Sequence, residues 1–452
     1  MVSHSLHLSA SIYLLPEEIL SEITLLSMLP LDSLSIWSSP VLAVCSRWRA
    51  CAINTPRIWS CIMILPWKYS RERVECWLER SGSGCPLYLT VRETRVFKAL
   101  EASWLNQTPD PGRRVRHLSF IQKGYMHDED FPFPIRFDTS NLRSLDAQLL
   151  PRGIRESFTP TYKPFANNPP QHLQKLGLST LGWALFVKLS SLDVSSLVSL
   201  VLTQDTKPDG VLTILTLTPR LRHFEWDVSS SLRSAPFKDN NPLILTSLHR
   251  LVLRGNHVVA DVLGHLTTPN LRQLSIEGVW TNDMFRSHFA FAMTCPRVVH
   301  LNICDQAFNR RALFAKDVLD LLYALPRLEY LGIEWRDRNI EGLLGLCGEF
   351  PGSEEEDTSR WACPDIRKLT LPVSKYRSTG ICSREQLARC LGRLVDKRCQ
   401  TSELEGTGSR LSLTVDIDES TMVSLVGEQW RACGGESLRF LDFPPAEEDY
   451  DP

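Results

Sequence analysis

The chain has 452 residues, of which 43% are hydrophobic and 23% are charged, a composition typical of globular proteins. Its 50 Lys and Arg residues nearly balance its 52 Asp and Glu residues, so the formal net charge is −2 and the composition indicates neither a nucleic-acid partner nor a membrane-surface partner. The first sixteen residues have no cationic start and no clear cleavage site, and no uncharged apolar run is long enough to span a membrane. We therefore expect a soluble cytoplasmic or nuclear protein that is not secreted.

The N-terminal residues predict a helix that begins at Leu15 and Pro16. Proline fits the first helical position, and Glu17 and Glu18 suit the positive end of the helix dipole. Pro30 ends the apolar run. The apolar side chains that fall on one face of this helix are Ile19, Leu20, Ile23 and Leu26.

A second helix is predicted to begin with Ser39 as its N-cap and Pro40 as its first residue. Its apolar stripe consists of Val41, Val44, Cys45, Trp48 and Ala52. A short turn that begins at Pro56 then carries Ile58 and Trp59. A unit of three short helices is near the size at which its core alone is marginal, so it would gain stability from a neighbour or a partner.

This order of elements, LPEEILSEI followed by VLAVCSRWRACAINTPRIW, resembles an F-box, and in particular the F-box of the large fungal families of F-box proteins. The residues that carry the resemblance are Leu15-Pro16, Glu18, Ile19-Leu20, Glu22-Ile23, Val44-Cys45, Arg47-Trp48 and Trp59. The residues assigned to the family's middle helix are Leu31, Leu34 and Ile36. The resemblance implies a partner, because F-boxes bind the Skp-type adaptor of cullin–RING ubiquitin ligases through the Leu-Pro turn and a face of these helices. The residues assigned to adaptor binding are Leu15, Pro16, Ile19, Leu20, Ile23, Val44, Trp48 and Trp59.

These apolar residues have two possible roles. Apolar residues on a unit too small to bury them mark an interaction site, which agrees with adaptor binding. The alternative is that they pack against one another or against residues 63–110, so that the segment only caps a repeat array. Residues 63–110 themselves predict a junction, with a helix in SRERVECWLERSG and a strand in CPLYLTV. Exposure of Leu15, Ile19 and Ile23 distinguishes the two roles.

An apolar pattern, L-x-x-L-x-φ with φ apolar, recurs after residue 110. The copies begin at residues 115, 142, 173, 197, 221, 248, 271, 298, 328 and 366. Five of these ten have a proline two residues before the first apolar position. The chain has 28 prolines among 452 residues, so proline occurs at this position more often than chance would give. Periods of about 20–30 residues with a short strand core are typical of leucine-rich repeats. One copy, LHRLVLRGN with Asn256, completes the consensus and the others lack the asparagine, so we expect an irregular α/β solenoid: a curved parallel sheet with helices outside.

One face of such a sheet is the usual binding surface of repeat arrays. The third, fifth and seventh positions of the motif point away from the core and line this concave face. Their mixture of charged and hydrogen-bonding groups suits a target protein better than a phosphate backbone. The residues assigned to target binding are His223, Glu225, Arg250, Arg254, Gln273, Glu277, His300, Asn302, Tyr330 and Glu334.

The sequence lacks the common catalytic motifs for nucleotide binding, acyl transfer and zinc-dependent hydrolysis, so we expect no catalytic residue, no cofactor and no enzymatic activity. Thirteen cysteines without C-x-x-C or zinc-like spacing predict inert thiols and no metal site. The similar surroundings of His117, His223 and His300 follow from their shared third position in the motif. A hydrolase in residues 372–452 is disfavoured because that region has no histidine.

The pattern predicts five segments along the chain: an N-terminal tail at 1–12, the F-box at 13–62, the junction at 63–110, the solenoid at 111–443 and an acidic tail at 444–452. Late in the solenoid, RLSLTVDI predicts a strand, SLRFLDF a terminal unit and SREQLARCLGRLVDKRC a helix. The implied function is that of a substrate receptor of an SCF-type ubiquitin ligase, in which the F-box binds the adaptor and the solenoid binds a target protein. The alternative is a leucine-rich-repeat scaffold outside any ligase.

Overall fold

The computed structural model divides the chain into two compact units, Met1–Leu197 (unit 1) and Val198–Pro452 (unit 2). The residues that the structure describes are 15–28, 43–64, 71–92, 94–105, 111–124, 135–151, 165, 168–179, 193–203, 208–228, 242–255, 259, 262–278, 287, 290–292, 294–305, 315–333, 363, 366–371, 412–415 and 439–440. In this part of the chain, no helix combines the length and apolar character needed to cross a membrane.

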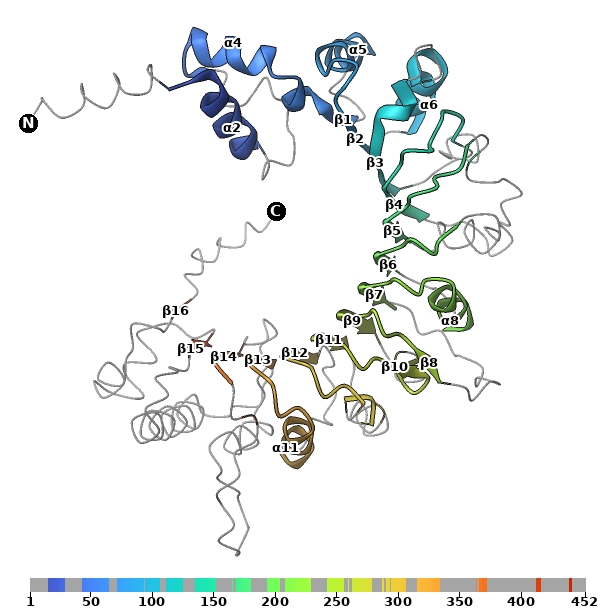
Figure 1. The fold of residues 1–452 in the computed structure, drawn as a ribbon, viewed down its shortest axis with the longest axis vertical. Helices are drawn as coiled ribbons and strands as arrows, with labels where there is room; N and C mark the ends of the chain where they lie inside the picture. Colours follow the sequence, from blue (N-terminus) through green and yellow to red (C-terminus); the bar gives the residue numbers. More distant parts are fainter. Residues whose placement is uncertain are drawn as a thin grey trace, which may run out of the picture. The chain divides into compact units, whose positions relative to one another are not determined.

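Unit 1 begins with helices and continues as a parallel sheet (Figure 1). Its α-helices are α2 (Glu17–Met28), α4 (Ser46–Asn54), α5 (Arg71–Arg80) and α6 (Thr94–Leu100). Shorter helical turns are η2 (Pro56–Ser60), η3 (Glu101–Leu105) and η4 (Pro111–Arg114). Its strands are β1 (Cys61–Ile64), β2 (Leu87–Val91), β3 (Val115–Gly124), β4 (Ser144–Pro151) and β5 (Lys175–Leu178). The helix predicted in SRERVECWLERSG and the strand predicted in CPLYLTV are confirmed as α5 and β2.

The sheet of unit 1 begins before the repeat pattern does. Strand β1 pairs in parallel with β2, which pairs in parallel with β3, and the order continues to β4 and β5. Ile62 and Ile64 are buried on β1, in the alternation typical of a strand with one covered face. Segments that the sequence assigned to the end of the helical region and to the junction therefore supply the first two strands of this sheet.

Unit 2 contains the α-helices α8 (Pro208–Thr216) and α11 (Ala315–Ala324). The strands of its main sheet, all parallel, are β6 (Ser199–Thr203), β7 (His223–Asp227), β9 (Arg250–Gly255), β11 (Gln273–Gly278), β12 (His300–Asp305), β13 (Tyr330–Ile333), β14 (Lys368–Leu371), β15 (Ser412–Val415) and β16 (Arg439–Phe440). A second small sheet pairs β8 (Leu243–Ile244) with β10 (Leu266–Thr267). The late strand and terminal unit predicted from RLSLTVDI and SLRFLDF are confirmed as β15 and β16, whereas SREQLARCLGRLVDKRC lies outside the described residues.

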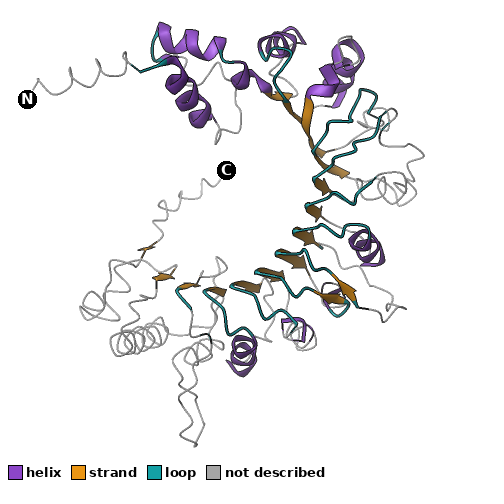
Figure 2. Cartoon of the chain, viewed as in Figure 1, coloured by secondary structure: helices purple, strands orange, loops and turns teal. Residues whose placement is uncertain are grey.

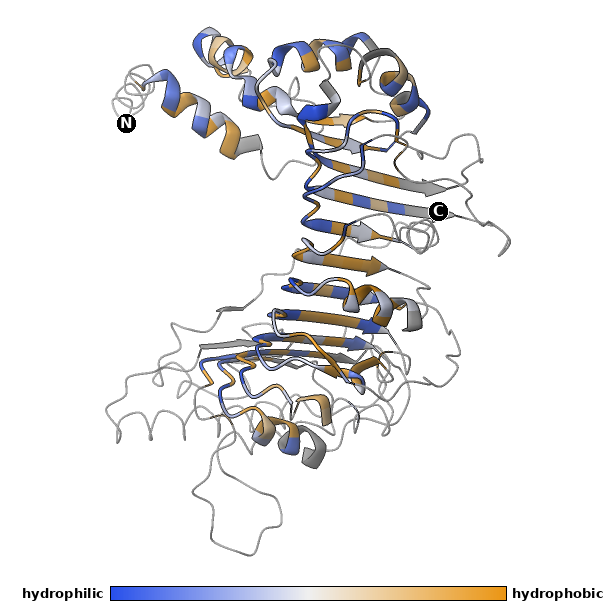
Figure 3. Ribbon diagram, turned by 45° about the vertical axis from the view of Figure 1, so that its right-hand side comes forward, coloured by the Kyte–Doolittle hydropathy of each residue, from blue (hydrophilic) through white to orange (hydrophobic). Residues whose placement is uncertain are grey.

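All ten predicted repeat copies form strands, β3 to β7, β9 and β11 to β14, and the strands run parallel within each unit. Along several strands, such as β7 and β11, buried apolar residues alternate with polar ones, whereas β9 has three consecutive apolar residues at 251–253 (Figure 3). On β7, for example, Phe224 and Trp226 are fully buried while Glu225 between them is half-buried. Stacking these apolar faces side by side makes the core, so the prediction of a parallel α/β repeat architecture is confirmed in each unit.

A repeated tight turn explains the proline that precedes many strands. The first apolar residue of the motif donates its backbone N–H to the carbonyl three residues earlier, as Leu221 does to Thr218 and Leu271 to Thr268, both at 3.1 Å. Proline occupies the second position of this four-residue turn, where its fixed φ is favourable and its missing N–H is not needed. The same turn closes before β12, β13 and β14, so this turn is a structural unit of the repeat.

The helices of unit 2 lie on one side of its main sheet (Figures 1 and 2). Leu321 and Leu322 of α11 are buried, so this helix contributes apolar side chains to the core. The opposite face of the strands carries the third and fifth motif positions and is not covered by any helix that the structure describes. This open face is the predicted binding surface.

The second predicted helix of unit 1 is interrupted at Cys45. Ser39 and Pro40 lie outside the described residues, but Cys45 has an extended backbone, with φ −162° and ψ 172°, and α4 begins after it at Ser46. The single stripe predicted from Val41 to Ala52 is therefore broken at Cys45. The break separates Val44, which is 56% exposed, from Trp48, which is buried.

We predict that His117 makes unit 1 sensitive to mild acid. Burial, and secondarily the charge of Lys175, lowers the pKa of His117 below its ordinary value. The unfolded chain therefore takes up this proton at higher pH than the folded chain, so the free energy of unfolding falls as pH drops below about 6.5 towards the folded-state pKa. His117→Gln is expected to reduce this fall in urea unfolding at pH 7.5 and 5.5. His172→Gln, which removes an exposed histidine of the same unit, is the matched control, and equal pH slopes for His117→Gln and the unmodified chain would contradict the prediction.

Candidate protein-interaction surfaces

The N-terminal helices of unit 1 hold a small core of their own. Leu20 from α2 and Trp48 and Cys51 from α4 are buried together, with Leu15 and Cys45 packed against them. Polar contacts fix the same pair of helices: the hydroxyl of Ser21 lies 3.1 Å from Cys51 Sγ and 3.0 Å from Thr55 Oγ1. The pairing places α2 against α4 along its Leu20 side.

The Leu15-Pro16 turn is tied to α4 by an arginine. A terminal nitrogen of Arg47 donates to the backbone carbonyl of Leu15 at 2.6 Å, and Leu20 N–H donates to the carbonyl of Pro16 at 3.1 Å. The first bond satisfies a carbonyl just outside the helix, and the second is the first turn of α2. Arg47 therefore sets the position of the turn at the start of α2.

One face of α2 presents apolar side chains to solvent. Ile19, Ile23 and Leu26 are 46%, 37% and 64% exposed, and their i, i+4, i+7 spacing places them on one stripe. Val44, in the break before α4, is another exposed apolar residue. We call Ile19, Ile23 and Leu26 the α2 stripe. Contiguous exposed apolar side chains of this kind mark a protein-interaction surface.

The residues assigned to adaptor binding separate into two groups. Leu20, Trp48 and Trp59 are buried and support the helices from inside, while Ile19, Ile23, Val44 and Pro16 are exposed and Leu15 is half-buried. Trp59 donates its Nε1–H to the carbonyls of Ala52 and Ile53, at 3.1 and 3.0 Å, and the guanidinium of Arg80 lies 4.7 Å from the centre of a Trp59 ring. Trp59 thus joins the end of α4 to α5. The exposed group is the one that is accessible to a partner.

The open face of unit 2 carries its side chains in rows. Register pairs His223 with Arg250, Arg250 with Gln273, Gln273 with His300 and His300 with Tyr330, so the third motif positions form one continuous row. The fifth and seventh positions form parallel rows farther along the strands. The structure therefore brings nine of the ten residues assigned to target binding onto this face, and Glu334 lies outside the described residues.

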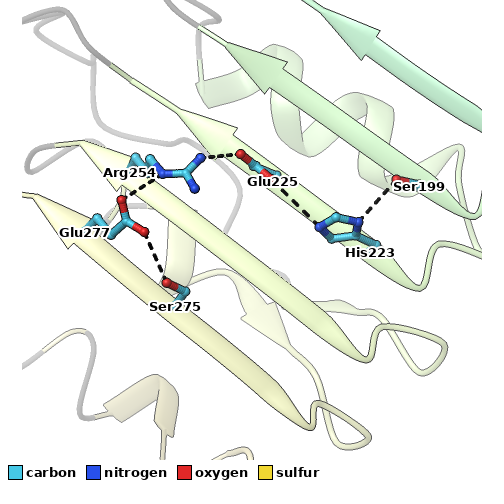
Figure 4. A network of polar contacts seen from close by, with 6 residues as sticks. All are labelled: Ser199, His223, Glu225, Arg254, Ser275 and Glu277. Carbon is cyan, nitrogen blue, oxygen red and sulfur yellow. Dashed lines mark hydrogen bonds and ion pairs between the residues drawn. The ribbon is translucent and has the colours of Figure 1, made fainter. Parts of the chain in front are cut away.

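Part of this face is occupied by its own ion pairs (Figure 4). Arg254 on β9 donates from one terminal nitrogen to Glu225 on β7 and from Nε to Glu277 on β11, the second at 2.8 Å. Burial disfavours the arginine charge, but these carboxylates outweigh it and raise the pKa of Arg254. Burial also raises the pKa of the nearby Asp227 carboxyl; Arg254 opposes this shift, and the two glutamates add to it. These charges satisfy one another, so they are less available to a target than the sequence suggested.

The remainder of the row ends in an aromatic and cationic cluster. The rings of His300 and Tyr330 stack with centres 5.4 Å apart and planes at 29°, and Lys368 Nζ lies 5.4 Å from the Tyr330 ring centre. A side chain at position 332 would overlap Asn302 and approach the Tyr330 hydroxyl, so Gly332 leaves room for both to lean across β13. The sequence assignment omitted Lys368, although its third motif position in IRKLTL is the signal that places it in this row.

We find no feature for metal or thiol chemistry in the described ranges. No group of three His, Cys, Asp or Glu side chains there is placed to hold a metal ion. Burial raises the pKa of the Cys295 thiol, which is far from the electropositive, exposed setting of a reactive cysteine. The apolar and charged side chains of these surfaces are suited to binding other molecules.

Comparison with known proteins does not identify a function for these surfaces. No protein-family model matches the chain, and a comparison with curated protein sequences finds no match. The two surfaces themselves are therefore the basis for a functional proposal.

Proposed function

We propose that the chain is a substrate receptor of a cullin–RING ubiquitin ligase, in which the N-terminal helices bind a Skp-type adaptor and the repeat strands bind a target protein. The observation that carries the proposal is the α2 stripe: Ile19, Ile23 and Leu26 are exposed in a segment whose sequence resembles an F-box. The Leu15-Pro16 turn at the start of α2, held by Arg47, provides a second contact point of the kind that the resemblance implies.

In this proposal the chain positions its partners, and its own side chains perform no reaction. An adaptor bound at α2 and a target bound at the strands would share one polypeptide, so the target's lysines would experience a raised effective concentration of the ubiquitin-loaded enzyme. The row of polar side chains on the open face of unit 2 suits the second task, because binding and catalytic residues are commonly displayed by a regular scaffold.

The rival function is a scaffold in which the N-terminal helices only cap the repeats. That function would require Ile19 and Ile23 to be covered by residues 63–110. Both side chains are more than one-third exposed, which favours adaptor binding over the cap. Trp59 and Arg80 supply the contact between α4 and the residues that follow, without using the α2 stripe.

The direct test is a titration of the full chain with a purified Skp-type adaptor by isothermal calorimetry. We expect a one-to-one complex with a dissociation constant of about 1 μM or below. Co-elution of the two proteins in size-exclusion chromatography should accompany the heat signal. Neither heat nor co-elution at about 50 μM of each protein would overturn the adaptor-binding function.

A further inference from the structure

A row of cationic side chains follows the edge of unit 2 at which its parallel strands begin, and we call it the strand-start edge. Its members directly precede a strand, open a strand or lie in the turn before one: Arg220, Arg222, Arg250, Arg272, Arg297, Arg327, Arg367 and Lys368. Because β7, β9, β11, β12, β13 and β14 are parallel and in register, all eight residues lie at the same end of the sheet.

These cations differ from Arg254 because they have no acidic partners among the described residues. All eight are exposed, and none forms an ion pair with a carboxylate among the residues that the structure describes. Arg297 donates to the side-chain oxygen of Asn270 at 2.7 Å, a neutral partner. In the same row of positions, Glu329 is the one acidic residue whose side chain is described. The edge is therefore strongly cationic in a chain whose net charge is only −2.

Backbone hydrogen bonds hold neighbouring members of the edge side by side. His249 N–H donates to the carbonyl of Arg222, and Arg272 N–H donates to the carbonyl of His249, both at 2.9 Å. Adjacent strands lie about 4.8 Å apart, so the five steps from β7 to β14 span roughly 24 Å. An extended peptide rises about 3.3 Å per residue, so roughly seven residues would cover the edge.

The charges farther along the strands favour a peptide over a nucleic acid. Glu225, Asp227 and Glu277 lie two to four residues beyond the first row, which is roughly 7 to 13 Å along an extended strand. This distance is comparable to the Debye length of about 10 Å. The three carboxylates outnumber Arg254 beside them, so their remaining negative charge would repel phosphates spread over the face. A single acidic strand of polypeptide laid along the edge would contact the cations without extending over the carboxylates.

We propose that the strand-start edge of unit 2 binds an acidic, Asp- and Glu-rich segment of a target protein in an extended conformation. Carboxylates along the segment would pair with the exposed guanidinium groups, a favourable match because guanidinium binds carboxylate with two parallel hydrogen bonds. The inference rests on the proposed function in that the segment belongs to the target, but the binding itself requires no adaptor.

The test measures fluorescence anisotropy of a labelled octaglutamate peptide titrated with the full chain in the absence of adaptor. We expect saturable binding that weakens at least about tenfold when NaCl is raised from about 50 to about 500 mM. An octaglutamine peptide with the same label should not bind, because it lacks the charge. No saturable binding of octaglutamate at the lower salt concentration overturns the proposal.

Charge reversal at the edge gives the sharper readout. Arg222→Glu combined with Arg272→Glu should weaken octaglutamate binding at least about tenfold. Both side chains are exposed, so circular dichroism should report an unchanged fold. The matched control, Arg49→Glu with Arg73→Glu, makes the same change in net charge at exposed positions of unit 1 and should keep the affinity within about twofold.

Two further outcomes would overturn the proposal. Equal loss of affinity in the edge variant and the control variant would show an effect of net charge alone. Tighter binding of an eight-nucleotide single-stranded RNA than of octaglutamate would identify a nucleic-acid surface instead. The adaptor titration separates this inference from the proposed function. A chain that binds the adaptor but not the peptide would refute only the proposal that the strand-start edge binds an acidic segment. A chain that binds the peptide but not the adaptor would refute only the proposed ligase function.

Discussion

Replacing Ile19 and Ile23 together by serine is expected to weaken binding of the Skp-type adaptor by about 100-fold. Each substitution removes an exposed apolar side chain of the α2 stripe that the proposed complex would bury. Truncation of a central interface residue commonly costs about 1–3 kcal/mol, and a combined loss of about 3 kcal/mol corresponds to roughly 100-fold in affinity. Calorimetric titration of the double variant against the adaptor measures the change.

The same double variant should remain folded, because neither side chain is part of the buried cluster of Leu20, Trp48 and Cys51. Leu217→Ser, which removes an exposed leucine from unit 2, is the matched control and should bind the adaptor with unchanged affinity. Leu20→Ala should instead destabilise unit 1 by about 2–5 kcal/mol, because that side chain is fully buried. Unchanged adaptor affinity in the Ile19 and Ile23 variant would contradict the assignment of the α2 stripe.

Gly278→Ala is expected to lower the free energy of unfolding of unit 2 by about 3 kcal/mol or more. Gly278 ends β11 with a φ of +157°, and a Cβ there would overlap the backbone carbonyl of Gly255 on the neighbouring strand. The overlap involves backbone on both sides, so it can be relieved only by separating β9 from β11. Urea unfolding followed by circular dichroism measures the change.

Two glycines of unit 1 serve as controls for this substitution. At Gly84 a Cβ would meet no atom within 4 Å, so Gly84→Ala should change the free energy of unfolding by less than about 0.5 kcal/mol. At Gly82 the space is also open but φ is +62°, so Gly82→Ala should cost about 1 kcal/mol from backbone strain alone. A cost for Gly278→Ala no larger than that for Gly82→Ala would show that the strands separate easily.

The amino-acid sequence predicts where the strands of this protein lie. Most copies of the motif place two apolar residues with a polar one between them, as Leu274, Ser275 and Ile276 do, and this period of two is the signature of a strand with one buried face. Proline at the second position of the preceding turn adds a local signal, because its fixed φ suits that turn. Local patterns of this kind predict where strands begin and which face is buried.

The candidate surfaces were only partly predictable, because neighbouring residues on one predicted stripe differ in burial. Leu20 and Ile19 share the apolar face of α2, yet Leu20 is fully buried against α4 and Ile19 is 46% exposed. The extended backbone at Cys45 turns α4 so that Trp48 faces Leu20, and the helical period of the sequence gave no sign of that break. Which side of a small helix meets its neighbour depends on packing between segments that lie about thirty residues apart.

The sequence alone therefore determined the repeated strands, their turns and the polar character of the open face, because these follow from the chemistry of consecutive residues. The tertiary structure decided which of those polar residues form ion pairs with one another and which are left exposed to a binding partner. Arg254 and Arg250 lie on the same strand and the same face, but register places Asp227 and Glu277 beside Arg254, whereas it places His223 and Gln273 beside Arg250. Arg254 also reaches Glu225 on β7. Pairing between strands is a non-local property, and it leaves the cations of the strand-start edge exposed.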